Sequence, residues 1–253
     1  MFEKNTNLAA AILGVLVAVG LAVGGYFVST TFYKGRLASN TVNVKGFAER
    51  DVKADLALWH IGYSLTGGNL ADLYSRSSAD EDTLIGFLVS KGFKKEDIKS
   101  GNLQVNDLFA NNYRPNGVGE GQRYIIRNTI TVRSQDVALV DQSTHDLNDV
   151  IKQGIALTAN TVDFEFTKLN DIKAPMLRAA TQNAREAAQQ FANDAGSKVG
   201  AIQSANQGFF SIVSSDSAAA QNPDGDRNYS PYQQSTIDKK VRVVVTLTYY
   251  LEK

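Results

Sequence analysis

The sequence predicts an α+β fold, a mostly antiparallel sheet with helices packed on one face, preceded by one N-terminal transmembrane helix. Residues 8–28 contain no charged residue and no proline. After residue 40, apolar residues recur at alternate positions in some segments and every three or four positions in others, as in strands and helices. These segments follow the order β-β-α-β-β-α-β-α-β-β. Residues 53–168 have the β-α-β-β-α-β order of a ferredoxin-like portion.

The first predicted element is the apolar run from Leu8 to Val28. As a helix it spans about 31 Å, which matches the hydrocarbon core of a bilayer. A retained signal anchor and a cleaved signal peptide are the two interpretations. The run exceeds the roughly 7–15 residues of a secretory apolar region, and its small-x-small site at Ala22-Val23-Gly24 lies inside the run. These features favour retention. A core helix is disfavoured because the run has no polar face.

This anchor divides the chain into four parts. Residues 1–7 are a short tail, 8–28 the transmembrane signal anchor, 29–40 a juxtamembrane connector and 41–253 a globular domain. An N-terminal apolar segment with little before it usually delivers the following domain across the membrane. We therefore expect residues 41–253 to be extracytoplasmic. The spacing of Gly20 and Gly24 is that of a helix-pairing face.

The first half of the domain begins with strands predicted over residues 41–49 and 53–66. The second strand places Ala57, Trp59, Ile61, Tyr63 and Leu65 on one face. A helix follows over 70–91, with Gly92 as its C-cap. Further strands are predicted over 98–108 and 122–133.

The second half continues with a helix over residues 135–152 and a strand over 161–168. The longest helix is predicted over 172–198. Spacings of three and four define its inward set as Leu177, Ala180, Ala184, Ala187, Phe191, Ala195 and Val199. A strand follows over 205–214. Residues 215–235 have few apolar side chains and indicate a mobile loop. The final strand, over 239–251, is long enough to be central or shared between subunits.

Composition excludes several classes of function. There are 26 basic and 26 acidic residues, so no basic field argues for nucleic acid binding. The chain has no cysteine, which excludes disulfides, thiol catalysis and cysteine metal sites. With only two histidines, His60 and His145, a metal centre would rest largely on carboxylates.

Five segments in a fixed order resemble the SIMPL domain family, over about residues 41–253. They are Val42-x-Val44-x-Gly46-Phe47-Ala48-Glu49-x-x-Val52-x-x-Asp55, then Lys91-Gly92-Phe93-x-x-Glu96-Asp97-Ile98, then Arg123-Tyr124-x-x-x-Asn128-x-Ile130-x-Val132, the Ala-rich helix Ala179 to Gly200, and the last strand Lys240 to Leu251. The family often has a proline before the aspartate, where this chain has Ala54.

The resemblance implies a bacterial cell-envelope protein, exported or anchored by its N-terminal segment and associated with stress tolerance. At least one family member is a large ring-shaped homo-oligomer. No catalytic residue and no cofactor is implied. We therefore expect a single-pass protein of the inner membrane with its domain in the periplasm. The expected partners are further copies of the chain and the bilayer, contacted through Leu8–Val28.

Few residues form candidate sites. Asp141, His145 and Asp149 stand four residues apart on one predicted helix, a weak metal-like pattern set against a solvated helix face. His60 is interpreted as a strand-face or interface histidine, set against a metal or acid–base role. Tyr229 and Tyr232, aromatic residues in the polar loop, are hypothesised to contact a partner or another subunit. Asp224–Asn228 begins like a calcium loop, but the later ligand positions do not fit. No nucleophile elbow, phosphate loop or dinucleotide fingerprint occurs.

Three hypotheses of function follow. The first is a membrane-anchored, non-enzymatic envelope protein whose domain assembles into a homo-oligomer with a scaffold or stress-protective role. The second is a module that binds a small molecule or an envelope partner. The third is a metal-dependent hydrolase centred on His145 and Asp149.

Overall fold

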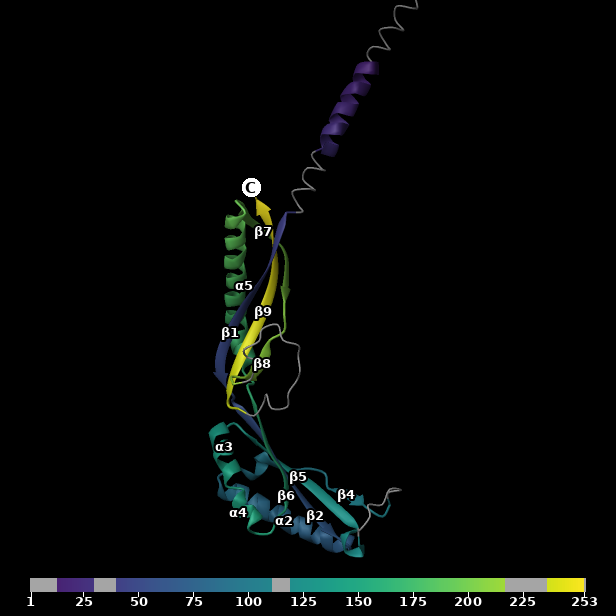
Figure 1. Cartoon of the computed structure of the whole chain (residues 1–253), viewed down its shortest axis with the longest axis vertical. Helices are drawn as coiled ribbons and strands as arrows, with labels where there is room; N and C mark the ends of the chain where they lie inside the picture. The colour runs from purple at the N-terminus through teal and green to yellow at the C-terminus, as the bar shows by residue number, and fades with distance from the viewer. Residues whose placement is uncertain (1–12, 30–39, 111–118, 217–235, 253) are drawn as a thin grey trace, which may run out of the picture. The chain divides into compact units, whose positions relative to one another are not determined.

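The computed structural model describes residues 13–29, 40–110, 119–216 and 236–252. It confirms a mixed α+β architecture of antiparallel sheets and helices (Figure 1). The chain forms two compact units. The first consists of Met1–Ala48, Pro175–Phe209 and Val243–Lys253, and the second of Glu49–Ala174 and Phe210–Arg242. Each unit is described by itself below.

The sheet of the first unit has the strand order β1-β9-β7, built from β1 (Thr41–Lys53), β9 (Asp238–Glu252) and β7 (Lys198–Gln207). Just before β1, Asn40 accepts a main-chain hydrogen bond from Leu251, and within β1 Asn43 donates to the Thr248 hydroxyl at 3.0 Å. The partner number falls as the β1 number rises, so the two strands are antiparallel. β7 and β9 are also antiparallel.

Helix α5 (Leu169–Asp194) packs on this sheet through alanine residues. Its buried residues in the first unit are Met176, Ala180, Ala184, Ala188 and Ala192. At Gly46 of β1, a Cβ atom would lie 2.2 Å from the Ala180 carbonyl oxygen and 2.4 Å from the Ala184 nitrogen. Only glycine permits this approach of helix backbone to strand backbone.

The inward face predicted for this helix was partly wrong. Ala180 and Ala184 are buried as predicted, but Phe191 is 61% exposed and Ala195 is exposed, while Leu177 and Ala187 are half-buried. The buried positions repeat every four residues, which turns the buried stripe by about 40° at each step. The stripe therefore winds around the helix, as packing against a twisted sheet requires.

The second unit contains an antiparallel sheet in the order β3-β5-β2-β6, with β4 also paired to β5. Its strands are β2 (Leu56–Gly67), β3 (Ile98–Ser100), β4 (Gln104–Asp107), β5 (Tyr124–Ser134) and β6 (Leu157–Glu165). Its helices are α2 (Leu70–Ser90), α3 (Val137–His145) and α4 (Asn148–Ile151), with short 3-10 turns at Lys95–Asp97 and Glu120–Gln122. This order agrees with the predicted β-α-β-β-α-β arrangement when β3 and β4 are counted as one strand and α3 and α4 as one helix. β8 (Ser211–Ser214) pairs with the start of β9.

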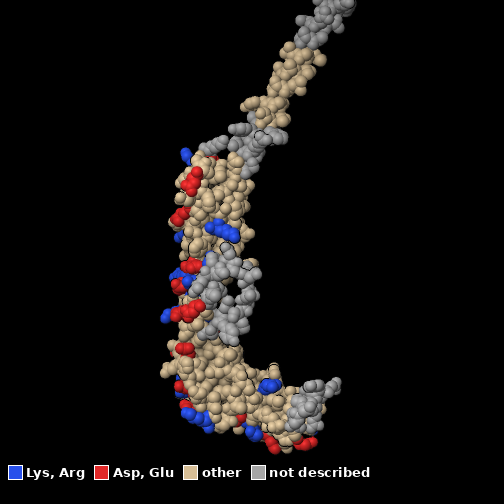
Figure 2. Space-filling model, viewed as in Figure 1, with Lys and Arg blue, Asp and Glu red and all other residues tan. Residues whose placement is uncertain are grey.

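The core of the second unit lies between its sheet and its helices. The predicted face of β2 is confirmed, because Ala57, Trp59, Ile61, Tyr63 and Leu65 are all buried. They pack with apolar residues of the helices and of the turn between α3 and α4, namely Leu73, Leu84, Leu88, Val140, Leu147 and Val150. The Trp59 and Phe93 rings lie 5.9 Å apart. On the face of the molecule shown in Figure 2, basic and acidic side chains are intermingled.

Several predicted boundaries differ from the structure. The strand predicted over 98–108 is two strands, because the pairing with β5 shifts by one position between Ser100, opposite Ile130, and Gln104, opposite Arg127. The helix predicted over 135–152 is two helices, since tight hydrogen bonds from Asp146 to Ser143 and from Asp149 to Asp146 interrupt it. The strand predicted over 205–214 is divided between β7 and β8.

The apolar N-terminal segment is described from residue 13 onward, where residues 13–29 are helical. Residues 8–12 of the predicted span lie outside the described residues. Among the helices that the structure describes, none is both long enough and apolar enough to cross a membrane. The predicted mobile loop falls almost entirely on residues outside the description, including Tyr229 and Tyr232.

Candidate functional site

A hollow of about 480 Å³ lies in the second unit between α3, α4 and β6. Its lining combines polar and apolar side chains: Thr144, His145, Leu147, Asn148, Ile151, Leu157, Thr158, Ala159 and Asn160. A concave surface with a few polar groups among apolar ones is typical of ligand-binding sites. The hollow is therefore the candidate site of the described residues.

Asn160 of β6 contributes to the lining of the hollow and is held by two hydrogen bonds. The antiparallel register places Asn160 opposite Ile61, so its side chain lies on the helix-covered side of the sheet. Its Oδ1 accepts a hydrogen bond from the Trp59 indole nitrogen at 2.8 Å, and its Nδ2 donates to the Thr144 carbonyl at 3.4 Å. Trp59 thereby satisfies its only polar group while it stays buried. Asn160 connects the core, the strand and the end of α3.

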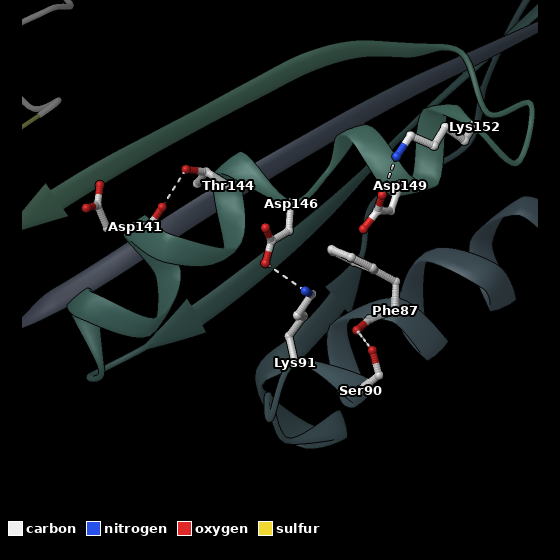
Figure 3. A network of polar contacts seen from close by, with 8 residues as sticks. All are labelled: Phe87, Ser90, Lys91, Asp141, Thr144, Asp146, Asp149 and Lys152. Atoms are coloured by element: carbon white, nitrogen blue, oxygen red, sulfur yellow. Dashed lines mark hydrogen bonds and ion pairs between the residues drawn. The ribbon is translucent and has the colours of Figure 1, made fainter.

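The helix side of the hollow depends on where α3 begins and ends. Asp136 caps α3, and its Oδ1 accepts from the Leu139 backbone nitrogen at 3.0 Å. Directly after α3 ends, Asp146 forms a 2.6 Å ion pair with Lys91, the residue that follows α2 (Figure 3). The Lys91 ammonium also lies 5.4 Å from the centre of the Phe87 ring. These contacts hold the turn between α3 and α4 against the end of α2.

A second ion pair stabilises α4. Lys152 donates to an Asp149 carboxylate oxygen at 2.9 Å (Figure 3). This hydrogen bond lowers the pKa of Asp149 and raises the pKa of Lys152. Both side chains are well exposed, so the pair contributes little to the free energy of unfolding.

The structure places the three weak metal candidates on two helices. Asp141 and His145 lie in α3, whereas Asp149 lies in α4 and is paired with Lys152. Figure 3 shows the Asp141 carboxylate pointing away from Asp149. Within the described part of the chain, no three histidine, aspartate or glutamate side chains gather as metal ligands would. Of the three candidates, only His145 lines the hollow.

His60 lies on the sheet face opposite Trp59. Its Nδ1 is 3.1 Å from the Thr131 hydroxyl on the neighbouring strand, and its Nε2 is 3.7 Å from an Asp163 oxygen. Cross-strand polar contacts of this kind are ordinary on a partly exposed sheet face. The arrangement agrees with the interpretation of His60 as a strand-face residue.

The other candidates remain predictions. Tyr229, Tyr232 and the Asp224–Asn228 segment lie outside the described residues. Gly20 and Gly24 fall in the described helix over 13–29. A Cβ added at either position would meet no described atom within 4 Å, which leaves room there for a pairing partner.

The segments that suggested the family supply contacts that hold the fold. Gly46 admits α5 to the sheet, as described above. Asp55 accepts hydrogen bonds from the Thr167 nitrogen at 2.7 Å and the Thr167 hydroxyl at 3.0 Å, just before α5 begins. Burial of Asp55 opposes ionisation, but these bonds and Lys168 lower its pKa. Gly92 has a φ of 103° and ends α2 in the left-handed conformation that favours glycine.

The middle segment is equally structural. Asn128 is buried and donates to the Tyr63 hydroxyl at 3.2 Å and to Glu81 at 3.1 Å. Arg123 pairs with Asp107 at 2.8 Å. These residues connect strands to one another or to α2, and none of them lines the hollow. The residues described from the resembling segments therefore stabilise the fold, and they do not line the candidate site.

Sequence reasoning missed the polar residues of the hollow apart from His145. One signal was present: Asn160 shares the alternation of Val162 and Phe164, so it is a polar residue on the apolar side of a strand. The participation of Asn148 and Thr158 depends on where the helix breaks and where β6 bulges opposite Gly62 and Tyr63. Local sequence patterns contain neither feature.

Comparison with known families gives a match to the SIMPL model, described as "Protein of unknown function (DUF541)", over residues 42–249. The search of curated proteins returned no match.

Proposed function

The chain belongs to the SIMPL family, and from that premise we propose a membrane-anchored, non-enzymatic protein of the bacterial cell envelope that assembles into a homo-oligomer. Its domain is placed in the periplasm, where the assembly serves as a scaffold or protects the envelope under stress. The proposal has two parts, assembly by the domain and tethering by the N-terminal helix. Each has its own support and its own test.

Assembly is supported chiefly by the free edges of the first unit's sheet. In the order β1-β9-β7, no strand among the described residues pairs with the outer edges of β1 or β7. β1 has 13 residues, long for an edge strand, and nearly all β7 side chains are exposed. Long edges with unpaired main-chain groups accept strands from other chains. A homo-oligomer that pairs these edges would remove both.

Tethering is supported by the apolar N-terminal helix. Its large side chains are exposed throughout residues 13–29, for example Leu13, Leu21 and Val28. Exposed apolar side chains around a whole helix favour transfer into lipid. A membrane tether also raises the local concentration of the domains, so weak contacts between subunits suffice for assembly.

The deciding experiment compares masses in solution. Light scattering would measure the detergent-solubilised full chain beside residues 40–253. We expect one discrete multi-subunit size for both, because the free edges belong to the domain. If only the full chain assembled, the contact between subunits would be assigned to the N-terminal helix and its Gly20/Gly24 face. Monomers in both preparations would contradict the proposal.

A second candidate function, binding of a small molecule or partner, is favoured by the hollow between α3, α4 and β6. A metal-dependent hydrolase is the third alternative, and the pairing of Asp149 with Lys152 weighs against it. Metal analysis of the purified protein and of the His145→Ala variant distinguishes the hydrolase hypothesis from the other two. The hydrolase hypothesis requires bound metal that the substitution removes.

A further inference from the structure

The sheet of the second unit ends at β6, and this edge borders the hollow. In the described residues, β6 pairs with β2 and with no other strand. Residues 159–165 keep an unbroken register with β2, so the backbone there has regular strand geometry. The bulge at the other end of β6 lies outside this stretch. Regular, unpaired strand edges are sites where an extended peptide can add a strand.

The hollow lies at one end of that regular stretch. Residues 157–160 belong both to β6 and to the lining of the hollow. Residues directly opposite each other in an antiparallel ladder point to the same face of the sheet. The side chain of an added strand opposite Asn160 would therefore point toward α3 and α4, into the hollow. Edge and hollow together form one binding surface.

The hollow favours an aliphatic side chain. Ile151 of α4 is 50% exposed although it is apolar, and Leu157 is half-buried on the strand side. Covering these two side chains is favourable, by roughly 25 cal/mol for each Å² of apolar surface. His145 and Asn148 add polar groups to the lining of the hollow.

Charge on the other face of β6 favours basic residues. Asp163 and Glu165 lie an odd number of positions after Asn160 in β6, so their side chains lie on the opposite face of the sheet. Both carboxylates interact electrostatically with the buried ammonium of Lys239. Burial lowers the pKa of Lys239, and the two carboxylates oppose this by raising it. Asp163 also lies 3.7 Å from His60 and keeps 39% of its side chain exposed. Two carboxylates beside one lysine leave this end of the strand acidic.

We propose that β6 binds an extended polypeptide by strand addition, with an aliphatic side chain in the hollow and a lysine or arginine opposite Asp163. Antiparallel addition continues the pattern of the sheet and is the more stable pairing. In that direction the basic residue precedes the aliphatic one by three positions, and a second basic residue opposite Glu165 precedes it by five. This inference does not depend on anchoring or on self-assembly.

The test uses a fluorescent peptide, Lys-Thr-Lys-Val-Thr-Leu-Thr, and the full chain in detergent, with binding followed by fluorescence anisotropy. We expect saturable binding that weakens at least about tenfold, or about 1.4 kcal/mol, when the leucine is replaced by aspartate. Replacing both lysines by glutamate should weaken it by a similar factor. N-methylation of alternate peptide nitrogens should abolish binding, because it removes the main-chain donors. Hydrogen exchange should show new protection of residues 159–165.

Protein variants test the same surface. Ile151→Asp should weaken peptide binding at least about tenfold, whereas Val89→Asp should leave it unchanged. Val89 is a matched control, because it is apolar, 46% exposed and not among the residues that line the hollow. Equal binding by the N-methylated peptide, no protection of 159–165, or no binding at all would overturn the proposal. The peptide series and the exchange data remain decisive even if Ile151→Asp folds poorly.

Discussion

At the scale of single residues, glycine at position 46 permits a close approach between β1 and α5. A Cβ there would lie 2.6 Å from the Ala184 Cβ and still closer to two backbone atoms. Backbone atoms cannot rotate away as a flexible side chain does. The contact is therefore steric and intolerant of even one added carbon.

Gly46→Ala should lower the free energy of unfolding by about 1–3 kcal/mol or more, because α5 must move off the sheet. Urea denaturation followed by circular dichroism measures the change. Gly86→Ala is the matched control, since a Cβ at this α2 position meets nothing within 4 Å. The control should stabilise the protein by roughly 0.5–1 kcal/mol, the usual effect of alanine in a helix. Equal effects of the two substitutions would contradict the assigned contact.

A second prediction at this scale concerns the buried amide of Asn128. Asn128→Leu removes the donors used by the Tyr63 hydroxyl and by Glu81 and buries no new partner. We expect a loss of about 1–3 kcal/mol, the cost of leaving buried polar groups unsatisfied. Trp59, the only tryptophan of the chain, reports the unfolding of this unit by its fluorescence. An unchanged midpoint in Asn128→Leu would show that the network does not stabilise the fold.

At the scale of secondary-structure elements, Asp55 attaches the start of β2 to the residues that precede α5. Its folded pKa lies below the ordinary value of 3.8, despite the opposing effect of burial. A depressed carboxylate pKa stabilises the folded state above the unfolded pKa, and this contribution is lost as pH falls through the folded pKa. The contribution of Asp55 is therefore present at neutral pH, begins to fall near the unfolded pKa of about 4, and is lost as pH drops further through the folded pKa.

Asp55→Asn should consequently destabilise the protein at pH 7 and make less difference at pH 3. Unfolding midpoints at the two pH values measure the effect. Asp141→Asn serves as the control, because Asp141 is exposed and its carboxylate makes no hydrogen bond in the described structure. A loss of stability that is the same at both pH values would mean that the negative charge of Asp55 does not contribute to the free energy of unfolding.

Elements with a simple alternation were predictable from sequence. The buried face of β2 follows from period-two patterning, and the end of α2 follows from Gly92. The inward face of α5 was only partly predictable, because its four-residue repeat reflects the twist of a sheet formed by distant segments. The hollow was not predictable for the same reason. It requires the α3–α4 break, which moved Asp149 out of line with His145, and the Trp59–Asn160 contact between residues 101 positions apart.

At the scale of the whole molecule, the proposed membrane tether can be tested directly. We expect the full chain to remain in the membrane pellet after alkaline carbonate extraction, because residues 8–28 carry no charge and match the thickness of a bilayer. A chain that begins at residue 40 should be extracted completely, which makes it the control. Release of the full chain by carbonate would favour the cleaved signal peptide.

The pairing of β1 with β9 also has a consequence for biosynthesis. Asn43 and its partner Thr248 are 205 positions apart, so β1, the first strand synthesised, can pair only after β9, the last strand, has been synthesised. At 5–20 residues per second, the ribosome needs roughly 10–40 s to synthesise the chain between them. The second unit, drawn mostly from the middle of the chain, has most of its strands complete well before then. During this interval β1 is attached to the nascent chain without its pairing strand. A chaperone that binds extended segments would act at that point, and a premature stop before β9 would leave β1 without this partner permanently.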